Sequence, residues 1–492
     1  MPELAATPPQ AELFASATTD DQLGERFCLA NDAVTRRASG ITLTPQWLVD
    51  AMLDSFGGDG VFDTVVDCGA GTGRFAIAAA ARWPAAKVVA VERGAEMAAL
   101  LRQRLVDTGL SQRVEIVVDD FRNFNAPERG RTLFIGNPPY VRHHHIEPEW
   151  KAWYSRGMAA LGVRASQLAG LHAHFMLHAL RQMRPGDAMC FVTAAEWLDN
   201  GYGEALRRLC AHQPGLALRG LWVADADDPV FSDALVSAAV VQVECSERGG
   251  DVTVGTVGAK RLNDVRRVPV ATLQASMRWS AQCQVLAPTT AVGIEVGELF
   301  RVTRGQVTGA NDIFVVAATQ RLLPACLVRP SVTRAKEIID GRVLTSEGAA
   351  GLRNVVDLPA DLDALDGPVR DAALAFIARA RATGADAGYV ARSRKPWYSV
   401  AMRAAPAAFV SYMGRRPPVF AANPFGVSFI NIAHGLYPRQ ALTAASLAAV
   451  LVHLNSTTDL RSGRVYGGGL AKFEPSDIAR LRVPAELLEF AA

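Results

Sequence analysis

The sequence predicts an α/β protein, with a doubly wound, mostly parallel, Rossmann-like sheet in the first half and a mixed α/β domain after it. Three features of the first half favour this fold. The short β-branched run Val65-Val66 precedes the glycine-rich turn 67–73 and a helical stretch from about residue 74 to 82, the order that opens nucleotide-binding sheets. Apolar runs at 87–91 and 114–118 each end at acids. A fourth run, 132–136, leads directly into Asn-Pro-Pro-Tyr.

The first turn reads Asp67-Cys68-Gly69-Ala70-Gly71-Thr72-Gly73. This Gly-x-Gly-x-Gly spacing differs from the Gly-x-Gly-x-x-Gly of dinucleotide sites, where glycines let the backbone approach a pyrophosphate. S-adenosylmethionine carries a sulfonium and an ammonium group but no phosphate. An acid at the start of the loop, Asp67, suits such a cation, so the turn favours S-adenosylmethionine as the ligand.

The acids at the next two strand ends predict further contacts in the same site. Glu92 can accept both ribose hydroxyls, as acids do in dinucleotide folds. Asp120 can accept from an adenine amino group while the ring of Phe121 covers the adenine face. A single Asp is more often a loop residue or a helix cap. Because ligands gather at the carboxyl ends of strands in open α/β sheets, three acids at three successive ends favour a binding site.

The segment Asn137-Pro138-Pro139-Tyr140 can hold a flat group that bears an amino group. The prolines stiffen the backbone, so the Asn137 side-chain oxygen and the Pro138 carbonyl point to one place. Both are acceptors and together can bind the two hydrogens of an exocyclic NH2 group, while a base stacks on Tyr140. Asn-Pro and Pro-Pro also mark ordinary rigid turns. Together with the glycine turn upstream, the segment favours an amino-group methyltransferase.

With these motifs in this order, the chain resembles the gamma-type (TaqI-like) DNA adenine-N6 methyltransferases of restriction–modification systems. The resemblance implies transfer of a methyl group from S-adenosylmethionine to N6 of an adenine flipped out of double-stranded DNA. It also implies roles for single residues. Thr44, in the segment 40–45, matches a Thr that touches the methionine part of the cofactor. Phe175 matches a Phe near the cofactor adenine, and Phe231 a second aromatic that holds the flipped base opposite Tyr140.

The second half resembles the family's target-recognition domain at 304–314, at 395–398 and in the glycine-rich segment 464–475. Residues 301–492 hold 23 Lys and Arg against 15 Asp and Glu, a net charge of +8, which fits a domain that contacts phosphates but is also ordinary for a soluble domain. The expected DNA-binding residues are Arg304, Lys395, Trp397 and Lys472. Trp397 is equally expected to be a core aromatic.

We expect two domains, a methyltransferase domain at 1–250 and a DNA target-recognition domain at 251–492, with the boundary somewhere between residues 246 and 295. The first 20 residues do not have the pattern of a signal peptide. The longest apolar stretches, such as 442–452, are too short to span a membrane. The seven cysteines include no Cys-x-x-Cys pair, and three consecutive histidines, 143–145, fit a polar loop better than a metal site. These features predict a cytoplasmic protein without a metal.

The resemblance further implies a monomer, and it leaves open whether a cognate restriction endonuclease is a partner or whether the enzyme acts alone. Three other functions remain open at this stage: an amino methyltransferase of RNA, one of a protein glutamine, and a DNA-binding protein without catalysis. Glutamine enzymes are shorter chains, and the C-terminal segments argue against RNA. The intact acids and Asn-Pro-Pro-Tyr argue against an inactive protein. Cytosine-C5 enzymes require a Cys nucleophile after a Pro, and this chain has no Pro-Cys pair.

Overall fold

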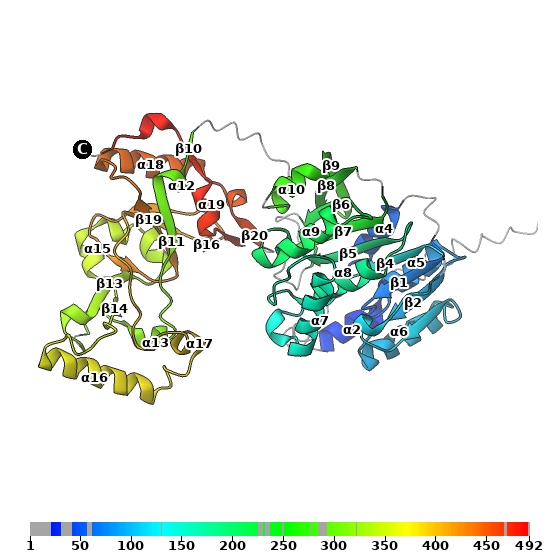
Figure 1. Ribbon diagram of the computed structural model, residues 1–492, viewed down its shortest axis with the longest axis horizontal. Helices are drawn as coiled ribbons and strands as arrows, with labels where there is room; N and C mark the ends of the chain where they lie inside the picture. Colours follow the sequence, from blue (N-terminus) through cyan, green and yellow to red (C-terminus); the bar gives the residue numbers. More distant parts are fainter. Residues whose placement is uncertain are drawn as a thin grey trace, which may run out of the picture. The chain divides into compact units, whose positions relative to one another are not determined.

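The computed structural model describes residues 21–30, 42–56, 62–128, 130–224, 230–231, 237–247, 250–276, 278–283, 293–320, 322–466 and 470–490. The chain divides into two compact units, residues 1–288 and 289–492 (Figure 1). This division lies within the expected window of 246–295 but well beyond residue 250. The reason is that residues 251–269 extend the sheet of the first unit as two further strands.

The described part of the first unit forms one nine-stranded sheet with the order β3-β2-β1-β4-β5-β7-β6-β8-β9. Strands β3 to β5 are parallel, β7 is antiparallel to its neighbours β5 and β6, and β8 is parallel to β6. The predicted doubly wound, mostly parallel sheet is therefore confirmed. The strands are β1 (Thr64–Cys68), β2 (Lys87–Val91), β3 (Val114–Val117), β4 (Thr132–Gly136), β5 (Ala188–Ala194), β6 (Leu216–Ala224), β7 (Ala238–Cys245), β8 (Asp251–Gly258) and β9 (Arg261–Pro269).

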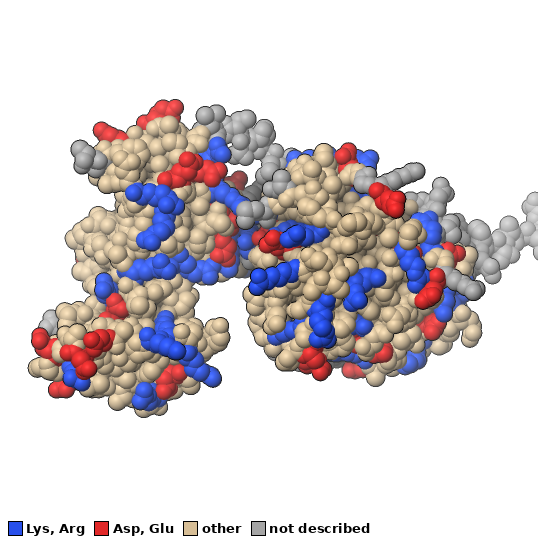
Figure 2. Space-filling model, in the orientation of Figure 1, with Lys and Arg blue, Asp and Glu red and all other residues tan. Residues whose placement is uncertain are grey.

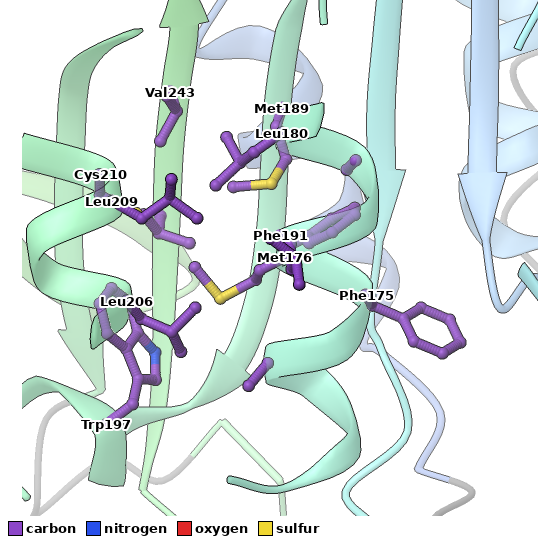
Figure 3. Close-up of a cluster of buried hydrophobic side chains, with 14 of the residues drawn as sticks. Phe175, Met176, Leu180, Met189, Phe191, Trp197, Leu206, Leu209, Cys210 and Val243 are labelled. Carbon is purple, nitrogen blue, oxygen red and sulfur yellow. The ribbon is translucent and has the colours of Figure 1, made fainter. Parts of the chain in front are cut away.

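Helices cover both faces of this sheet, because alternate side chains of a strand point to opposite faces. Val65 and Leu133 pack with helices α4 (Gln46–Asp54), α5 (Arg74–Arg82) and α6 (Ala95–Asp107). Val66 and Phe134 pack in a second cluster with α7 (Pro148–Ala159), α8 (Leu171–Gln182) and α9 (Glu204–His212). Figure 3 shows part of the second cluster, from which the ring of Phe175 extends apart from the other labelled side chains. Strands β1, β4 and β5 are buried along their whole length.

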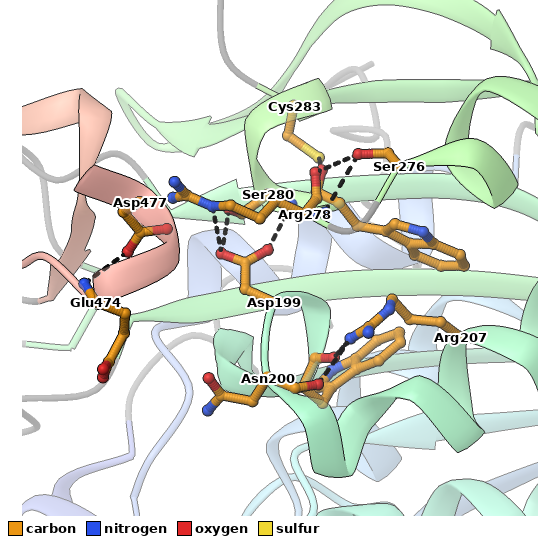
Figure 4. A network of polar contacts seen from close by, with 11 residues as sticks. Asp199, Asn200, Arg207, Ser276, Arg278, Ser280, Cys283, Glu474 and Asp477 are labelled. Atoms are coloured by element: carbon orange, nitrogen blue, oxygen red, sulfur yellow. Dashed lines mark hydrogen bonds and ion pairs between the residues drawn. The ribbon is translucent and has the colours of Figure 1, made fainter. Parts of the chain in front are cut away.

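Residues up to 283 are attached to the first unit by both apolar and polar contacts. The ring of Trp279 lies 6.0 Å from that of Trp197, and both are almost fully buried. Asp199 accepts hydrogen bonds from the hydroxyl and the backbone N–H of Ser280 (Figure 4). The remaining helical elements here are α2 (Gln22–Ala30), α10 (Val270–Ala275), α11 (Ser280–Cys283), η1 (Phe121–Asn123), η2 (His143–His145), η3 (Ala195–Leu198) and η4 (Gly201–Gly203).

The described part of the second unit mixes small sheets and helices, as predicted. The sheets are β11-β19-β15-β17, β12-β14-β13-β18, β16-β21-β20 and the pair β10-β22. Their strands are β10 (Ile294–Glu295), β11 (Phe300–Arg304), β12 (Val315–Val316), β13 (Val328–Val332), β14 (Asn354–Val356), β15 (Ala408–Ser411), β16 (Met413–Gly414), β17 (Phe420–Ala422), β18 (Ser428–Phe429), β19 (Ala433–Pro438), β20 (Arg464–Tyr466), β21 (Leu470–Lys472) and β22 (Arg482–Val483).

Two of the helices in this unit are long, α16 (Gly367–Ala382) and α18 (Ala444–Thr457), and α18 contains most of the apolar stretch 442–452. None of the described helices combines the length and the apolar character needed to cross a lipid bilayer. The shorter helices are α12 (Val296–Leu299), α13 (Asn311–Phe314), α14 (Ala335–Ile339), α15 (Ser346–Ala350), α17 (Tyr389–Arg392), α19 (Pro475–Ala479), η5 (Ala325–Leu327), η6 (Arg342–Leu344), η7 (Leu460–Ser462) and η8 (Ala485–Leu487).

Candidate cofactor and catalytic site

A pocket of about 360 Å³ lies in the first unit at the carboxyl ends of β1 to β4. This is the position at which open α/β sheets bind their ligands. Eight of the twelve catalytic and cofactor-binding residues predicted from the sequence line the pocket, although they come from segments far apart in the sequence. They are Thr44, Gly69, Gly71, Glu92, Asp120, Phe121, Asn137 and Phe175.

The glycine turn after β1 has the backbone shape that only glycine adopts easily. Gly69 and Gly73 both have φ of +79°, in the left-handed region. A Cβ atom on Gly69 would lie 3.4 Å from the ring of Phe175, so the ring lies directly against the turn. The turn therefore brings backbone and an aromatic face together at one edge of the pocket.

Asp67 is next to the lining of the pocket but is not part of it. Its carboxyl is completely buried, and Oδ2 accepts a hydrogen bond of 2.9 Å from the backbone N–H of Ala76 in α5. Oδ1 is buried without a hydrogen-bond partner in the described structure. Burial raises the pKa of Asp67 to about 7, and the nearby Glu92 acts in the same direction. A cation in the adjacent pocket would favour the ionised form of this carboxyl.

Glu92 connects the end of β2 to the glycine turn. Its Oε2 accepts from the backbone N–H of Gly71 at 2.8 Å, and its Oε1 accepts from that of Gly94 at 2.6 Å. Each oxygen of a carboxylate has room for a further donor. The side chain is therefore fixed in place and still able to accept a hydroxyl group from a ligand in the pocket.

Asp120 is held by Arg122, two residues further along the chain. Oδ1 accepts from Nε of Arg122 at 2.9 Å and Oδ2 from a terminal guanidinium nitrogen at 2.7 Å. Burial opposes ionisation, but the hydrogen bonds and the charge of Arg122 hold the pKa of Asp120 below its usual value. The guanidinium of Arg122 lies 3.7 Å from the centre of the Trp150 ring. Asp120 is thus an oriented carboxylate at the edge of the pocket.

Two phenylalanines supply the apolar wall beside these acids. The rings of Phe121 and Phe175 have their centroids 5.1 Å apart, and both side chains are almost fully buried. They line the same pocket as Glu92 and Asp120. An adenosine group needs an aromatic face for its base and acceptors for its hydroxyl and amino groups, and this part of the pocket offers both.

Asn137 follows β4 and is oriented by a backbone carbonyl from the start of the chain. Its Nδ2 donates to the carbonyl of Thr42 at 3.0 Å. Its Oδ1 is buried and has no hydrogen-bond partner in the described structure. The amide therefore presents its acceptor, and not its donor, to the pocket. Pro138 and Thr44 are both buried. Gly40 and Ile41 lie outside the described residues.

The two aromatic residues expected to hold a base are in contact with each other. The ring centroids of Tyr140 and Phe231 lie 6.1 Å apart with an angle of 75° between the planes. Phe231 is 5% exposed, and the hydroxyl of Tyr140 is buried without a partner among the described residues. Rings that sandwich a third ring lie about 7 Å apart and parallel. A base can therefore enter between these two only after the rings turn.

Sequence analysis missed several buried polar residues near the pocket. Arg74 lines it, and Asp21 holds Arg74 by an ion pair of 2.8 Å. His174 is stacked on Tyr154 with centroids 4.6 Å apart, and burial lowers its pKa to about 3, so it is neutral. The position of Arg74, directly after the last glycine of the turn, was the one available signal. Nothing in the sequence indicates that Asp21 lies against that turn.

The consecutive histidines form the short helix η2, and His144 and His145 are exposed. The rings of His143 and His144 have centroids 4.3 Å apart. Among the residues that the structure describes, no three His, Cys, Asp or Glu side chains are grouped so that they can hold a metal ion.

In the second unit, basic side chains gather on the face that Figure 2 shows. Two of the predicted DNA-binding residues share one acid: Arg304 donates to Glu474, and Nζ of Lys472 lies 2.7 Å from the same carboxylate. Lys395 is exposed, whereas Trp397 is half-buried against an apolar cluster. Trp397 thus contributes to packing, which was one of the two expectations for it. Gly467–Gly469 of the late glycine-rich segment lie outside the described residues.

The expected recognition segments at 304–314 and 395–398 lie next to each other. A guanidinium nitrogen of Arg394 donates to the carbonyl of Thr308 at 2.9 Å. The side chain of Gln306 donates to the carbonyl of Ala401 at 2.8 Å. Gly309, with φ of +84°, directly follows Thr308. Segments almost 90 residues apart in the sequence therefore form one surface region of the second unit.

Comparisons with known proteins agree with this division. Residues 65–161 match the family model described as a methyltransferase domain. Residues 284–491 match the model of the C-terminal domain of the type II methyltransferase M.Eco57I. The first match and the pocket at the strand ends define the class of the protein: it is a methyltransferase that uses S-adenosylmethionine.

Single relatives extend the match to most of the chain. The type II methyltransferase M.XamI of Xanthomonas campestris pv. amaranthicola is 42% identical over 454 residues, which are 91% of this chain and 85% of that protein. M.AccI of Acinetobacter calcoaceticus is 20% identical, over 76% of this chain and 74% of that protein. The chain therefore belongs to the type II DNA methyltransferases of restriction–modification systems, as the resemblance implied.

The fold also agrees with a solved structure. The type IIL restriction–modification enzyme MmeI, solved in complex with DNA, has a TM-score of 0.60 and 12% identity, and the match covers 94% of this chain and 69% of that one. At this identity the likeness shows a shared fold.

Proposed function

We propose that the enzyme transfers the methyl group of S-adenosylmethionine to N6 of an adenine that is flipped out of a specific double-stranded DNA sequence. The observation that carries the proposal is the amide of Asn137. Its nitrogen is bound to the Thr42 carbonyl, and its oxygen is buried and without a partner among the described residues. A buried acceptor without a donor costs about 1–3 kcal/mol, so its presence at a pocket favours a ligand that donates.

The residues of the pocket fit the cofactor. The rings of Phe121 and Phe175 and the carboxylates of Glu92 and Asp120 provide a place for the adenosine part. Oδ1 of Asp67 lies 3.4 Å from the position that a Cβ atom on Gly136, the residue before Asn137, would take, and Thr42 accepts from Asn137, so both groups lie on the side of Asn137. When bound, S-adenosylmethionine supplies a methyl group on a positively charged sulfur, which is ready for attack by an amine.

Asn137 addresses the main difficulty of the reaction, the weak nucleophile. The N6 lone pair of adenine is delocalised into the ring. An acceptor that binds the amino hydrogens localises this lone pair and stabilises the positive charge that develops on nitrogen. We assign this role to Oδ1 of Asn137, together with the carbonyl of Pro138. Positioning by the two prolines then supplies much of the acceleration, and no covalent intermediate is needed.

We propose that Tyr140 and Phe231 hold the flipped base between them. Their rings are already in contact at 6.1 Å, so the pair is present before the base arrives. Extrusion of the base from the duplex costs a few kcal/mol, and stacking on aromatic rings offsets part of this cost. In the second unit, we propose Arg304, Lys395 and Lys472 as phosphate contacts and Trp397 as a further DNA contact. We also propose that the enzyme acts as a monomer and that a restriction endonuclease of the same specificity is its partner.

The experiment that tests this function identifies the modified nucleoside. Purified protein is incubated with unmethylated genomic DNA and labelled S-adenosylmethionine, and the DNA is then hydrolysed. We expect N6-methyladenine, and far less label in the same time with the variant Asn137→Ala. N4-methylcytosine would keep the amino-group chemistry and overturn the base. Label found only in RNA or in protein would overturn the nucleic acid assignment. Long-read sequencing of the same product gives the recognised DNA sequence.

A further inference from the structure

The methionine part of S-adenosylmethionine ends in a carboxylate, and this group needs a cationic or N–H partner when it is taken from water. Among the described residues that line the pocket, two carry a guanidinium, Arg74 and Arg93. Arg93 is exposed and follows the acid Glu92 directly. Its charge acts on Asp120, so it lies on the side proposed for adenosine. Arg74 lies elsewhere in the pocket.

Arg74 is bound to the segment that also orients the catalytic amide. One of its terminal guanidinium nitrogens donates to the carbonyl of Thr44 at 2.7 Å. Two residues earlier, the carbonyl of Thr42 accepts from Asn137. The reactive methyl group must lie next to Asn137, so the methionine part of the cofactor extends along this segment. Arg74 is therefore on the methionine side of the pocket.

The guanidinium of Arg74 is fixed in direction. Its Nε donates to Oδ2 of Asp21 at 2.8 Å, and its side chain is 13% exposed. Nε and one terminal nitrogen of Arg74 make these two contacts, and the other terminal nitrogen has no acceptor among the described residues. This leaves a donor directed by two fixed contacts in a group that lines the pocket. Guanidinium is the group that matches a carboxylate best in geometry.

Asp21 is almost completely buried, and it holds more than Arg74. The hydroxyl of Thr72, in the glycine turn, donates to Oδ2, and the backbone N–H of Gly24 donates to Oδ1 at 2.8 Å. Nε of Arg104, in α6, lies 3.3 Å from Oδ1. One carboxylate thus connects the start of α2 with the glycine turn and with α6. Its contacts fix the position from which Arg74 reaches the pocket.

We propose that Arg74 binds the α-carboxylate of S-adenosylmethionine and that Asp21 is the positioning residue that directs Arg74 toward it. The inference rests on the proposed place of the reactive methyl group beside Asn137, and it is independent of the identity of the base and of the nucleic acid that receives the methyl group. A purely structural role of the Asp21–Arg74 pair is the competing explanation. The two differ in one respect: only direct binding depends on the carboxylate of the ligand.

The test compares two ligands by isothermal titration calorimetry: S-adenosylmethionine and its decarboxylated form, which has hydrogen in place of the carboxylate. The unchanged protein is expected to bind the decarboxylated form about 10- to 100-fold more weakly, the range for one hydrogen bond to a charged group. In Arg74→Gln, we expect the dissociation constant of S-adenosylmethionine to rise by the same factor, while that of the decarboxylated form stays the same. The difference between the ligands then disappears.

Two further variants keep the result clear if Arg74→Gln is poorly folded. Asp21→Asn retains Arg74 but not its charged partner, so we expect a smaller difference between the ligands than in the unchanged protein. Arg82→Gln is the matched control, because Arg82 lies in the same helix and pairs with Asp54 at 2.6 Å, but does not line the pocket. In Arg82→Gln, the two ligands should differ in dissociation constant by the same factor as in the unchanged protein.

Two results would overturn the proposal. Equal affinity of the unchanged protein for both ligands would show that no residue recognises the carboxylate. An equal loss of affinity for both ligands in Arg74→Gln, with the difference between them retained, would assign Arg74 to structure alone.

Discussion

The polar side chains at the ends of β1 to β4 form two groups. Glu92 and Asp120 have both carboxylate oxygens bound within the protein, by backbone N–H groups and by Arg122 respectively. Asp67 and Asn137 each use one atom for an internal hydrogen bond and keep one buried oxygen without a partner among the described residues. The first pair is satisfied before any ligand arrives, and the second pair is not.

This difference matches the chemistry expected of the two ends of the pocket. At the end proposed for adenosine, carboxylates that are already held need only add a further hydrogen bond, so they would give affinity by preorganisation. At the end proposed for the reaction, each buried oxygen without a donor is unfavourable in free energy. A ligand removes this penalty when it donates a hydrogen bond or brings a positive charge. Substitutions on the two sides should therefore separate catalysis from binding and from stability.

The largest effect is expected for Asn137→Ala. Loss of one oriented group that stabilises developing charge costs about 10²–10³-fold in rate. Because the role proposed for Oδ1 of Asn137 is on the substrate amine, the dissociation constant of S-adenosylmethionine should stay unchanged. Single-turnover methylation and calorimetry measure the two quantities on the same preparation. A variant that loses cofactor binding in proportion to rate would place Asn137 among the binding residues.

The substitution Arg122→Met tests the pair of acids whose oxygens are already hydrogen-bonded, because Arg122 holds both oxygens of Asp120. The guanidinium is 2% exposed and the Asp120 carboxylate 12% exposed, so the variant leaves a buried charge without its partner. We expect the free energy of unfolding to fall by about 3 kcal/mol, measured by urea denaturation. The double variant Asp120→Asn/Arg122→Met removes the unpaired charge as well and should recover part of the loss. Full additivity of the two substitutions would argue against a coupled pair.

Asp67 should make cofactor binding depend on pH. In the free protein the pKa of Asp67 is about 7, and a cation in the pocket favours the ionised form. Below pH 7 a proton must leave before binding, so the affinity for S-adenosylmethionine should fall by up to about tenfold per pH unit. Calorimetry between pH 5.5 and 7 measures this dependence, and Asp67→Asn should remove it. An identical pH profile in the variant would exclude Asp67 as the titrating group.

The contribution of Asp67 to the stability of the folded protein should change with pH in the opposite direction to cofactor affinity. The pKa of Asp67 in the folded protein lies above its value of 3.8 in the unfolded chain. The folded state therefore holds the proton more tightly, and this contribution to stability is complete below about pH 4 and is lost as the pH rises through about 7. The difference in unfolding free energy between the unchanged protein and Asp67→Asn should shrink or reverse over this range. Thermal unfolding at several pH values, without cofactor, measures it.

The sequence predicted the first four strands and most of the pocket because each strand ends in a residue whose chemistry is recognisable locally. It also paired Tyr140 with Phe231, which the structure places in ring contact. The internal partners were beyond its reach. The acceptor of the Thr72 hydroxyl is Asp21, 51 residues earlier, in a segment with no motif. Contacts of this kind depend on the packed fold and leave no periodic pattern.

The extent of the first unit was misjudged for a related reason. Strand β9 lies at the edge of the sheet, and most of its side chains are exposed or half-buried. An edge strand needs no continuous apolar face, so its sequence looks like a polar linker. A hydrogen bond attaches β9 to the rest of the sheet: the indole N–H of Trp222 in β6 donates to Asp264 in β9 at 2.8 Å. A long-range polar contact thus fixes a strand that hydrophobic periodicity does not reveal.

The smallest effect is expected in the second unit, where a satisfied acid lies between two proposed phosphate contacts. Glu474 binds Arg304 and Lys472, and these cations hold the pKa of Glu474 below its usual value although burial opposes this. Figure 4 shows Glu474 with Asp477, its partner in the capping box of α19. Glu474→Gln keeps an acceptor for the helix but removes the negative charge. Both cations are then available to phosphate.

We therefore expect Glu474→Gln to bind non-specific DNA more tightly by about threefold, the effect of one charge at roughly 6 Å in water. The plot of log affinity against log salt concentration should steepen by about 0.9, one additional phosphate contact. Fluorescence anisotropy over a salt series measures both. The control is Glu295→Gln, because Glu295 also caps a helix through a capping box and pairs with an arginine, Arg482, at 3.2 Å. Equal changes in the two variants would mean that overall charge, and not a phosphate contact at Arg304 and Lys472, sets the affinity.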